Sequence, residues 1–130
     1  TVSRLLRPGG KACLQSIVID DALWPRYIRS TDFIQQSIFP GGCLISESRF
    51  RGLAEERGLA WRDVRRFGGH FGGTLRQWRE RFDAVVAAAQ LPTGFDDRFV
   101  RLWRYYLQYC EGGFRGGGID VAQVTLEKTA

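Results

Sequence analysis

The run KACLQSIVI at residues 11–19 constrains the fold more than any other stretch of the chain. It is an apolar run, and its length and β-branched residues are typical of a strand buried on both faces. Gly9-Gly10 ends the segment before it, and Asp20-Asp21 can cap a helix after it. A strand of this kind needs helices or a second sheet on either side. The sequence therefore predicts a layered domain around residues 11–19.

Two helices are expected between this strand and the next. The first spans Asp21 to Phe39, tolerates Pro25 in its first turn, and stops at the glycines that follow Pro40. The second is shorter, has Ser46 or Ser48 as its cap, and ends at Gly58. Its expected inward residues are Phe50, Leu53 and Ala54.

The second half of the chain predicts a strand, two long helices and a final strand. LAWRDVRRF at 59–67 is the strand candidate, and a double-glycine loop follows it. The capping-box pattern at 74–77 predicts the start of the first long helix. Asp96 or Asp97 is expected to cap the second, which the glycines from Gly112 onward end, and IDVAQVTLEK is expected to be the last strand.

The predicted element order defines an α/β fold. About three strands with several covering helices look like one half of an open sheet. The length of 130 residues suits one domain, and the chain contains no methionine. We therefore expect residues 1–130 to be a single partial domain of a longer protein.

Charge and cysteine usage limit the function classes. The net charge of +5 comes mainly from arginine, which suits an anionic partner, either nucleic acid or an acidic lipid surface. No apolar run is long enough to span a bilayer, and no secretion signal is visible, so a cytoplasmic protein is expected. Three widely spaced cysteines and one histidine argue against a zinc site or a disulfide framework.

The stretch FGGHFGGT at 67–74 superficially resembles a phosphate-binding loop. Gly68 and Gly73 have the spacing of the two glycines in that motif, but Thr74 stands where the phosphate-binding lysine is required. His70 is the only histidine, and no nearby nucleophile or carboxylate pattern marks it as a general base. A polar residue in a loop is the simpler interpretation of His70.

Five segments together resemble the cyclopropane-fatty-acyl-phospholipid synthases and the related mycolic-acid methyltransferases. They are LLRPGGKACLQSI, DFIQQSIFPGGCL, FGGHFGGTLRQWRERF, FVRLWRYYLQYCEGGFR and IDVAQVTLEK, which cover most of the chain in order. The resemblance implies the C-terminal half of a class I, Rossmann-like, S-adenosylmethionine-dependent methyltransferase fold. The implied cofactor-binding half would precede Thr1, so the isolated chain is expected to be inactive.

The resemblance also implies a site for bicarbonate, the anion that acts as the base in this family. The family's histidine position falls on Gln15, the isoleucine on Ile17 and the tyrosine on Phe71. Gln15 can still donate and accept a hydrogen bond, whereas Phe71 cannot donate one. Two of the three positions therefore depart from the family pattern, and His70 is a candidate replacement for the missing donor.

The function implied by the resemblance is methyl transfer to unsaturated acyl chains of phospholipids. The helices from Asp21 to Phe39 and from Thr74 to Cys110 would cover the acyl chain, and the arginines would face anionic phospholipid at the inner face of the membrane. No nucleic-acid partner is expected, and a homo-oligomer is left open. The alternatives are a non-catalytic basic module that binds nucleic acid or anionic membrane, and a degenerate family member. The predicted substrate contacts are Phe39, Trp78 and Tyr106.

Overall fold

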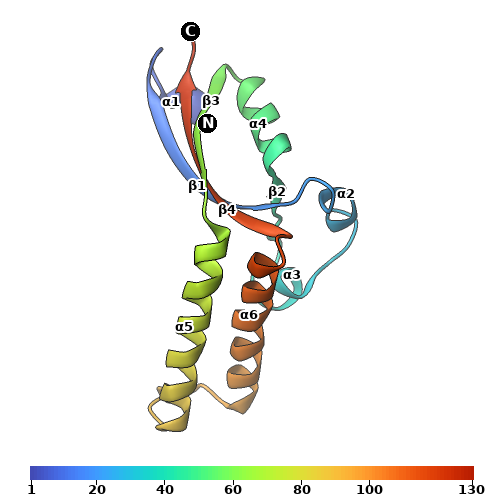
Figure 1. The fold of residues 1–130 in the computed structure, drawn as a ribbon, viewed down its shortest axis with the longest axis vertical. Coiled ribbons are helices and arrows are strands. Elements are labelled where there is room, and N and C mark those ends of the chain that lie inside the picture. The colour runs from blue at the N-terminus through green and yellow to red at the C-terminus, as the bar shows by residue number, and fades with distance from the viewer.

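The computed structural model describes residues 1–130 as one four-stranded sheet with helices around it (Figure 1). The strand order is β2-β1-β4-β3, in which β1 is parallel to β2 and β4 is antiparallel to both β1 and β3. The α/β class is confirmed, and the two-residue strand β2 is an addition that the sequence did not predict. The strands are β1 (Lys11–Ile19), β2 (Ile45–Ser46), β3 (Leu59–Arg66) and β4 (Ile119–Lys128), and the helices are α1 (Val2–Leu5), α2 (Trp24–Tyr27), α3 (Phe33–Ser37), α4 (Glu47–Glu55), α5 (Gly68–Ala87) and α6 (Asp97–Arg115).

The most deeply buried strand is β4 and not β1. Val121 and Val124 of β4 are each 1% exposed, because β4 has a strand on either side and packed side chains on both faces. In β1 only Val18 and Ile19 are buried, and the rest of the strand is half-buried or exposed. The prediction that the whole of residues 11–19 is covered on both faces is therefore wrong for this chain. The physical reason is that exposed and half-buried residues alternate from Lys11 to Ile17, so one face of the strand is left open over most of its length.

Two apolar clusters hold the helices to opposite faces of the sheet. One contains Val124 and Leu126 of β4 with Ala54 of α4, and the other contains Val121 of β4 with Leu75 of α5. Successive side chains of a strand point to opposite faces, so the odd and even positions of β4 serve different clusters. Burying each large apolar side chain in these clusters stabilises the fold by about 1.5–3 kcal/mol.

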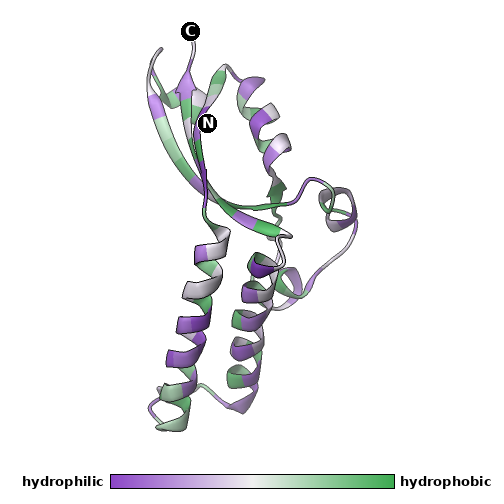
Figure 2. Ribbon diagram, viewed as in Figure 1, coloured by the Kyte–Doolittle hydropathy of each residue, from purple (hydrophilic) through white to green (hydrophobic).

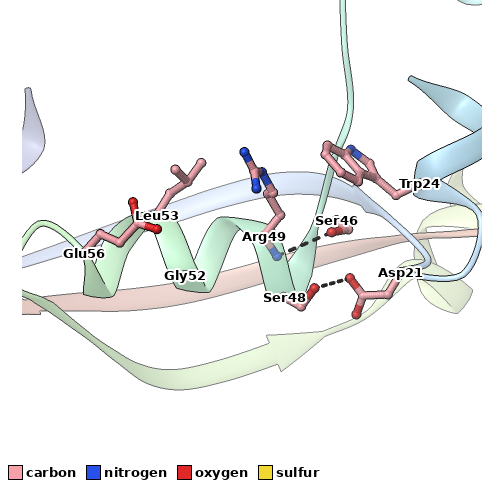
Figure 3. A pocket seen from close by; sticks show the side chains of 8 residues that line it. All are labelled: Asp21, Trp24, Ser46, Ser48, Arg49, Gly52, Leu53 and Glu56. Atoms are coloured by element: carbon pink, nitrogen blue, oxygen red, sulfur yellow. Dashed lines mark hydrogen bonds between the residues drawn. The ribbon is translucent and has the colours of Figure 1, made fainter. Parts of the chain in front are cut away.

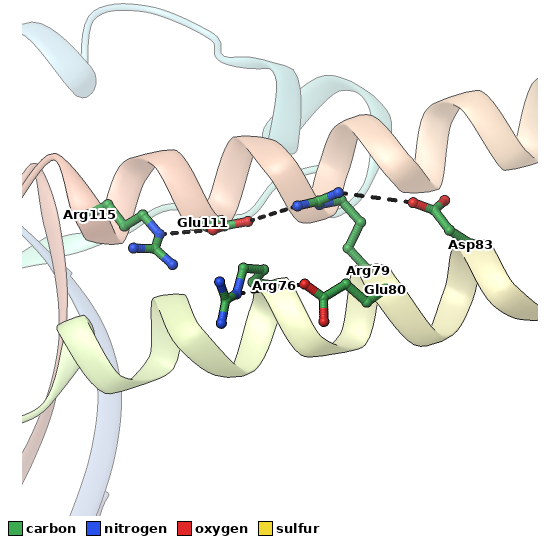
Figure 4. Close-up of polar contacts among 6 residues, drawn as sticks. All are labelled: Arg76, Arg79, Glu80, Asp83, Glu111 and Arg115. Carbon is green, nitrogen blue, oxygen red and sulfur yellow. Dashed lines mark hydrogen bonds and ion pairs between the residues drawn. The ribbon is translucent and has the colours of Figure 1, made fainter.

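Helices α5 and α6 form an antiparallel hairpin that extends beyond one end of the sheet (Figure 1). Arg79 of α5 lies 3.8 Å from Glu111 of α6 (Figure 4). Asp83 of α5 also accepts a 2.7 Å hydrogen bond from Arg104 of α6. Hydrophilic and hydrophobic residues alternate along both helices (Figure 2). Even the long hairpin helices lack the apolar length needed to cross a bilayer.

The helix predicted from Asp21 to Phe39 is two short helices, α2 and α3, with a break between them. Asp32 causes the break, because its carboxylate accepts a hydrogen bond from the Gln35 backbone while the Gln35 side chain accepts one from the Asp32 backbone. This capping box starts a new helix where the sequence pattern predicted continuation. We call residues 20–44 the lid segment.

The predicted double-glycine loop is also wrong, because residues 68–73 are the first two turns of α5. A methyl group on Gly68 would lie 2.5 Å from Asp120 Oδ1, and Gly72 packs against Phe114 and Arg115 of α6. The glycines therefore allow close helix packing and do not cradle a phosphate. Thr74 caps nothing, since its hydroxyl donates to the His70 carbonyl inside the helix.

The second long helix passes the glycines that were predicted to end it. Asp96 caps α6 as expected, by accepting a 2.8 Å hydrogen bond from the Phe99 backbone, but the helix continues to Arg115. A methyl group on Gly113 would lie 3.0 Å from Ile119 Cδ1. Gly113 is thus a packing position within the helix, and the later glycines end it.

Candidate functional site

An apolar cavity of about 500 Å³ lies between the lid segment, α6 and the carboxyl end of β1. In open α/β sheets, ligands bind at the carboxyl ends of strands, which is where this cavity opens. Most of its lining is hydrophobic. The lining includes Ile17, Ile19, Leu23, Tyr27, Asp32, Phe39, Tyr106, Tyr109 and Cys110.

The floor of the cavity comes from one face of the sheet. Ile17 and Ile19 occupy alternate positions of β1 and therefore point to the same side, where they pair with Val121 and Ile119 of β4. Gly118, just before β4, brings the lid close, because a methyl group there would lie 3.2 Å from Leu23 Cδ1. A glycine at this turn thus lets the lid close over the floor.

Aromatic side chains join the lid to α6. The ring of Phe39 meets that of Tyr106 edge-to-face at 6.3 Å, and the ring of Phe33 meets that of Tyr105 at 4.7 Å. The Tyr109 hydroxyl donates a long hydrogen bond of 3.4 Å to Asp32 Oδ2. Edge-to-face aromatic pairs each contribute about 0.5–1.5 kcal/mol beyond the area that they bury. These contacts hold the lid in place without a covalent tie.

Polar contacts also stabilise the lid from within. The Tyr27 hydroxyl accepts a 2.9 Å hydrogen bond from the Leu44 backbone, and the Gln35 side chain donates one of 2.9 Å to the Gly42 carbonyl. Both bonds join the helical part of the lid to residues 42–44, which lead to β2. The lid is therefore a small ordered unit of its own.

Burial disfavours the charged forms of the thiol and two of the phenol groups of the cavity. Removal from water raises the pKa of the Cys110 thiol to about 11, and it also raises the pKa of Tyr27 and of Tyr106. A thiol with such a pKa carries almost no thiolate at neutral pH, so Cys110 is a poor nucleophile there. The only carboxylate of the lining, Asp32, caps α3. This cavity is built to hold an apolar ligand.

Two of the three predicted substrate contacts line the cavity. Phe39 and Tyr106 belong to its lining, where their rings are in edge-to-face contact. Trp78 does not reach it; its ring packs against Phe71 at 6.0 Å and is 47% exposed. The sequence reasoning missed Tyr27 and Asp32 as lining residues, whereas Tyr109 lies at a groove as its aromatic pattern predicted. The signal for Asp32 was its three-residue spacing from Gln35, which is that of a capping box.

Of the three predicted bicarbonate positions, Ile17 alone belongs to the cavity lining. Gln15 lies two residues earlier on the same face of β1, where its side-chain oxygen accepts a 2.8 Å hydrogen bond from Gln123. Phe71 packs edge-to-face on Phe114 at 5.0 Å, within the cluster that contains Val121. His70 is exposed on α5, turned about 100° from Phe71 by the helix.

A second, polar cavity of about 340 Å³ lies at the start of α4 (Figure 3). Ser46 caps α4, and Ser48 donates a hydrogen bond to Asp21 that lowers the pKa of that carboxyl. The guanidinium of Arg49 lies 5.5 Å from the Trp24 ring centroid. These contacts fasten the start of the lid to α4, and the cavity serves no evident ligand.

The comparisons with known proteins agree with this architecture. The family model described as mycolic acid cyclopropane synthetase matches residues 1–124. The tuberculostearic acid methyltransferase UfaA1 of Mycobacterium tuberculosis is 39% identical over 127 residues, which are 96% of this chain and 29% of that protein. The cyclopropane-fatty-acyl-phospholipid synthase of Escherichia coli is 33% identical over 96 residues, 74% of this chain and 24% of that protein.

A solved structure shows the same fold. Mycolic acid cyclopropane synthase CmaA1, in complex with SAH and CTAB, superposes with a TM-score of 0.79 at 27% identity, over 96% of this chain and 46% of that one. The chain thus spans less than half of each protein with which it is compared here. Sequence and structure agree that the chain belongs to the mycolic acid cyclopropane synthetase family.

Proposed function

We propose that this chain forms the acyl-binding part of an S-adenosylmethionine-dependent methyltransferase that acts on unsaturated acyl chains of phospholipids. The observation that carries the proposal is the apolar cavity at the carboxyl end of β1, floored by Ile17 and covered by the lid. An acyl chain is uniform hydrocarbon, so it gains from apolar walls and needs few polar contacts. The activity belongs to the complete protein, and the isolated chain is proposed to be inactive.

The cofactor does not fit this cavity. S-adenosylmethionine carries a sulfonium, an ammonium, a carboxylate and an adenosine, and the lining offers Asp32 as its only charged group. Burying those charges against apolar walls would cost several kcal/mol. We therefore assign the cofactor to the part of the protein outside these residues and the acyl substrate to this cavity.

The residues of the cavity would favour the reaction in two ways. They would exclude water and nucleophiles, and their aromatic rings would stabilise positive charge with π-electron density. Methylation of a cis double bond places positive charge on the acyl chain. The rings of Phe39 and Tyr106 present electron-rich faces that stabilise a nearby cation. With its thiol held neutral, Cys110 would not capture that cation as a thiolate. The chain thus protects a reactive acyl group from water and from nucleophiles.

The base that completes the reaction is the point at which this chain departs from the family pattern that the resemblance implies. Gln15 accepts from Gln123 through its oxygen, so its NH₂ group can still donate to an anion such as bicarbonate. Phe71 offers no donor, and the ring lies among other aromatic rings. We propose that Gln15 orients the base alone, with a methyl-branched or methylene product as the alternative to a cyclopropane ring.

The test uses the complete protein with methyl-labelled S-adenosylmethionine and vesicles of a cis-unsaturated phospholipid. A Gln15→Ala variant is expected to lower turnover by about 10–100-fold while cofactor affinity changes little, because a lost base contact acts on the chemical step. The matched control is Gln77→Ala, an exposed glutamine on α5. Equal losses of turnover and cofactor affinity in Gln15→Ala would show that Gln15 has no specific role in the reaction.

A further inference from the structure

Exposed apolar side chains concentrate around the cavity. Of the nine large hydrophobic residues with exposed side chains, six lie in the lid, in the facing part of α6 or at the cavity floor, so the exposure is not scattered. Ile28 is 46% exposed and Phe39 is 57% exposed. Exposed apolar side chains that cluster beside a pocket mark an interaction surface. The six are Ile17, Leu23, Ile28, Phe39, Tyr105 and Tyr109.

The same lid carries two arginines that have no acidic partner. Arg26 and Arg29 lie on either side of Tyr27-Ile28 and make no ion pair; seven other arginines of the chain are also unpaired, and eight are paired. The carboxylates that precede and follow them in the sequence already have partners, since Asp21 accepts a hydrogen bond from Ser48 and Asp32 accepts from Gln35 and Tyr109. The lid therefore presents free positive charge next to exposed hydrocarbon. Figure 1 shows α2 at the outer edge of the molecule, away from the tip of the α5–α6 hairpin.

We propose that the lid segment, residues 20–44, is the surface that docks the protein on an anionic phospholipid bilayer. This inference rests on the proposed function, because it names the route by which the acyl substrate reaches the cavity. Amphipathic segments of this composition lie in the interface with their apolar side chains about 5–10 Å deep and their arginines near the phosphates. Leu23 and Phe39 belong to both the docking surface and the cavity lining.

The consequence is a continuous apolar path from bilayer to cavity. An acyl chain that entered across open water would lose about 0.8 kcal/mol for each exposed CH₂. With the lid embedded, the chain would pass between Leu23 and Phe39 without leaving hydrocarbon. The lid is held only by aromatic and hydrogen-bonded contacts such as Phe39–Tyr106 and Tyr109–Asp32, which can separate and re-form.

The test measures binding of the complete protein to sedimenting vesicles, with phosphatidylglycerol mixed into phosphatidylcholine. The variant Arg26→Gln/Arg29→Gln is expected to bind about 30-fold more weakly, which corresponds to ~1 kcal/mol for each arginine. The control is Arg98→Gln/Arg101→Gln, two exposed and unpaired arginines of α6 that remove the same total charge. The control is expected to change binding by less than about threefold. Equal losses in the two variants would overturn the proposal.

A second matched pair of variants tests the apolar part of the docking surface. Ile28→Ser is expected to weaken vesicle binding by about tenfold or more, as for an isoleucine that is withdrawn from hydrocarbon. Leu5→Ser, at a leucine that is 80% exposed on α1, is expected to leave binding unchanged. Circular dichroism of each variant shows that the fold is intact. Unaltered binding of Ile28→Ser would contradict docking through the lid.

Further outcomes distinguish the docking surface from the proposed function and from nucleic-acid binding. If the wild type methylates detergent-dispersed lipid while both arginine variants bind vesicles normally, the docking surface is wrong and the proposed function stands. If vesicle binding depends on Arg26 and Arg29 but no methyl transfer occurs, the docking surface stands and the proposed function fails. Duplex DNA is the competitor: displacement of the vesicles by DNA at physiological salt would mean that the arginines bind nucleic acid, which overturns the proposal.

Discussion

Replacement of Gly68 by alanine tests whether residues 68–73 are a packed helix start. The added methyl group would lie 2.5 Å from Asp120 Oδ1, 3.0 Å from Asp120 Cα and 3.1 Å from Phe114 Cδ1. Two of these atoms belong to a strand and to a buried ring, so neither can move freely. The same Asp120 oxygen accepts a 2.7 Å hydrogen bond from the Gly68 backbone, which the displacement would weaken.

The expected cost combines overpacking with a damaged hydrogen bond. Overpacking typically costs about 1–3 kcal/mol, and a hydrogen bond to a charged acceptor contributes about 1.5–3 kcal/mol. Because the bond is weakened and not removed, we expect Gly68→Ala to lower the free energy of unfolding by about 2–4 kcal/mol. The neighbouring Gly69 meets nothing within 4 Å. Gly69→Ala is therefore expected to raise stability by about 0.5–1 kcal/mol, the usual gain of alanine over glycine in a helix.

Urea denaturation followed by circular dichroism measures both variants under the same conditions. The prediction is a lower midpoint for Gly68→Ala and an equal or higher midpoint for Gly69→Ala, with the slope unchanged. A flexible glycine loop would instead give similar small effects at the two positions. Equal midpoints for the two variants would therefore refute the packed helix start.

Two other predictions concern the cavity. Tyr27→Phe should destabilise the protein by about 1–3 kcal/mol in urea denaturation, because the Leu44 N–H loses its acceptor; a Tyr105→Phe control, whose hydroxyl makes no hydrogen bond, should not. In a Cys13→Ser/Cys43→Ser variant, alkylation of Cys110 should rise only as the pH approaches about 11, since burial raises the pKa of this thiol. The thiol of the unfolded chain titrates near pH 8.5. Between about pH 8.5 and 11 only the unfolded chain loses this proton, so the free energy of unfolding should fall as the pH rises through that range. Half-maximal alkylation near pH 8.5 would contradict the burial of Cys110.

The sequence predicted elements well where one local signal decided the outcome. Ser46 and Asp96 cap their helices as expected, and three of the four strands lie where the apolar runs placed them. The two-residue strand β2 was missed because a pair of residues has no periodicity. The sequence pattern alone could not show that Gly68 and Gly113 are packing positions. The atoms that require glycine at Gly68 belong to Asp120 and Phe114, which are far away in the sequence. Those at Gly113 belong to Ile119, which no sequence signal links to the glycine.

The site was predicted in part for the same reason. Tyr106 lies on an apolar stripe at helical spacing and Phe39 at the predicted end of a helix, and both line the cavity; their contact with a substrate stays a prediction. Trp78 shares such a stripe but packs on Phe71, since helical periodicity gives the face of a helix and not its position along the axis. The roles of Gln15, Phe71 and His70 come from the family resemblance and stay predictions.

The most direct test of the central claim is transfer of a labelled methyl group by the complete protein to a cis-unsaturated phospholipid. Mass spectrometry of the recovered lipid reports the label and the acyl position that carries it. The account predicts a labelled acyl chain that is one CH₂ heavier, and a sharp loss of this product when Ile17 is replaced by tryptophan to fill the cavity floor. A folded protein that binds S-adenosylmethionine yet leaves every acyl chain unlabelled would contradict the claim that this cavity holds the methyl acceptor.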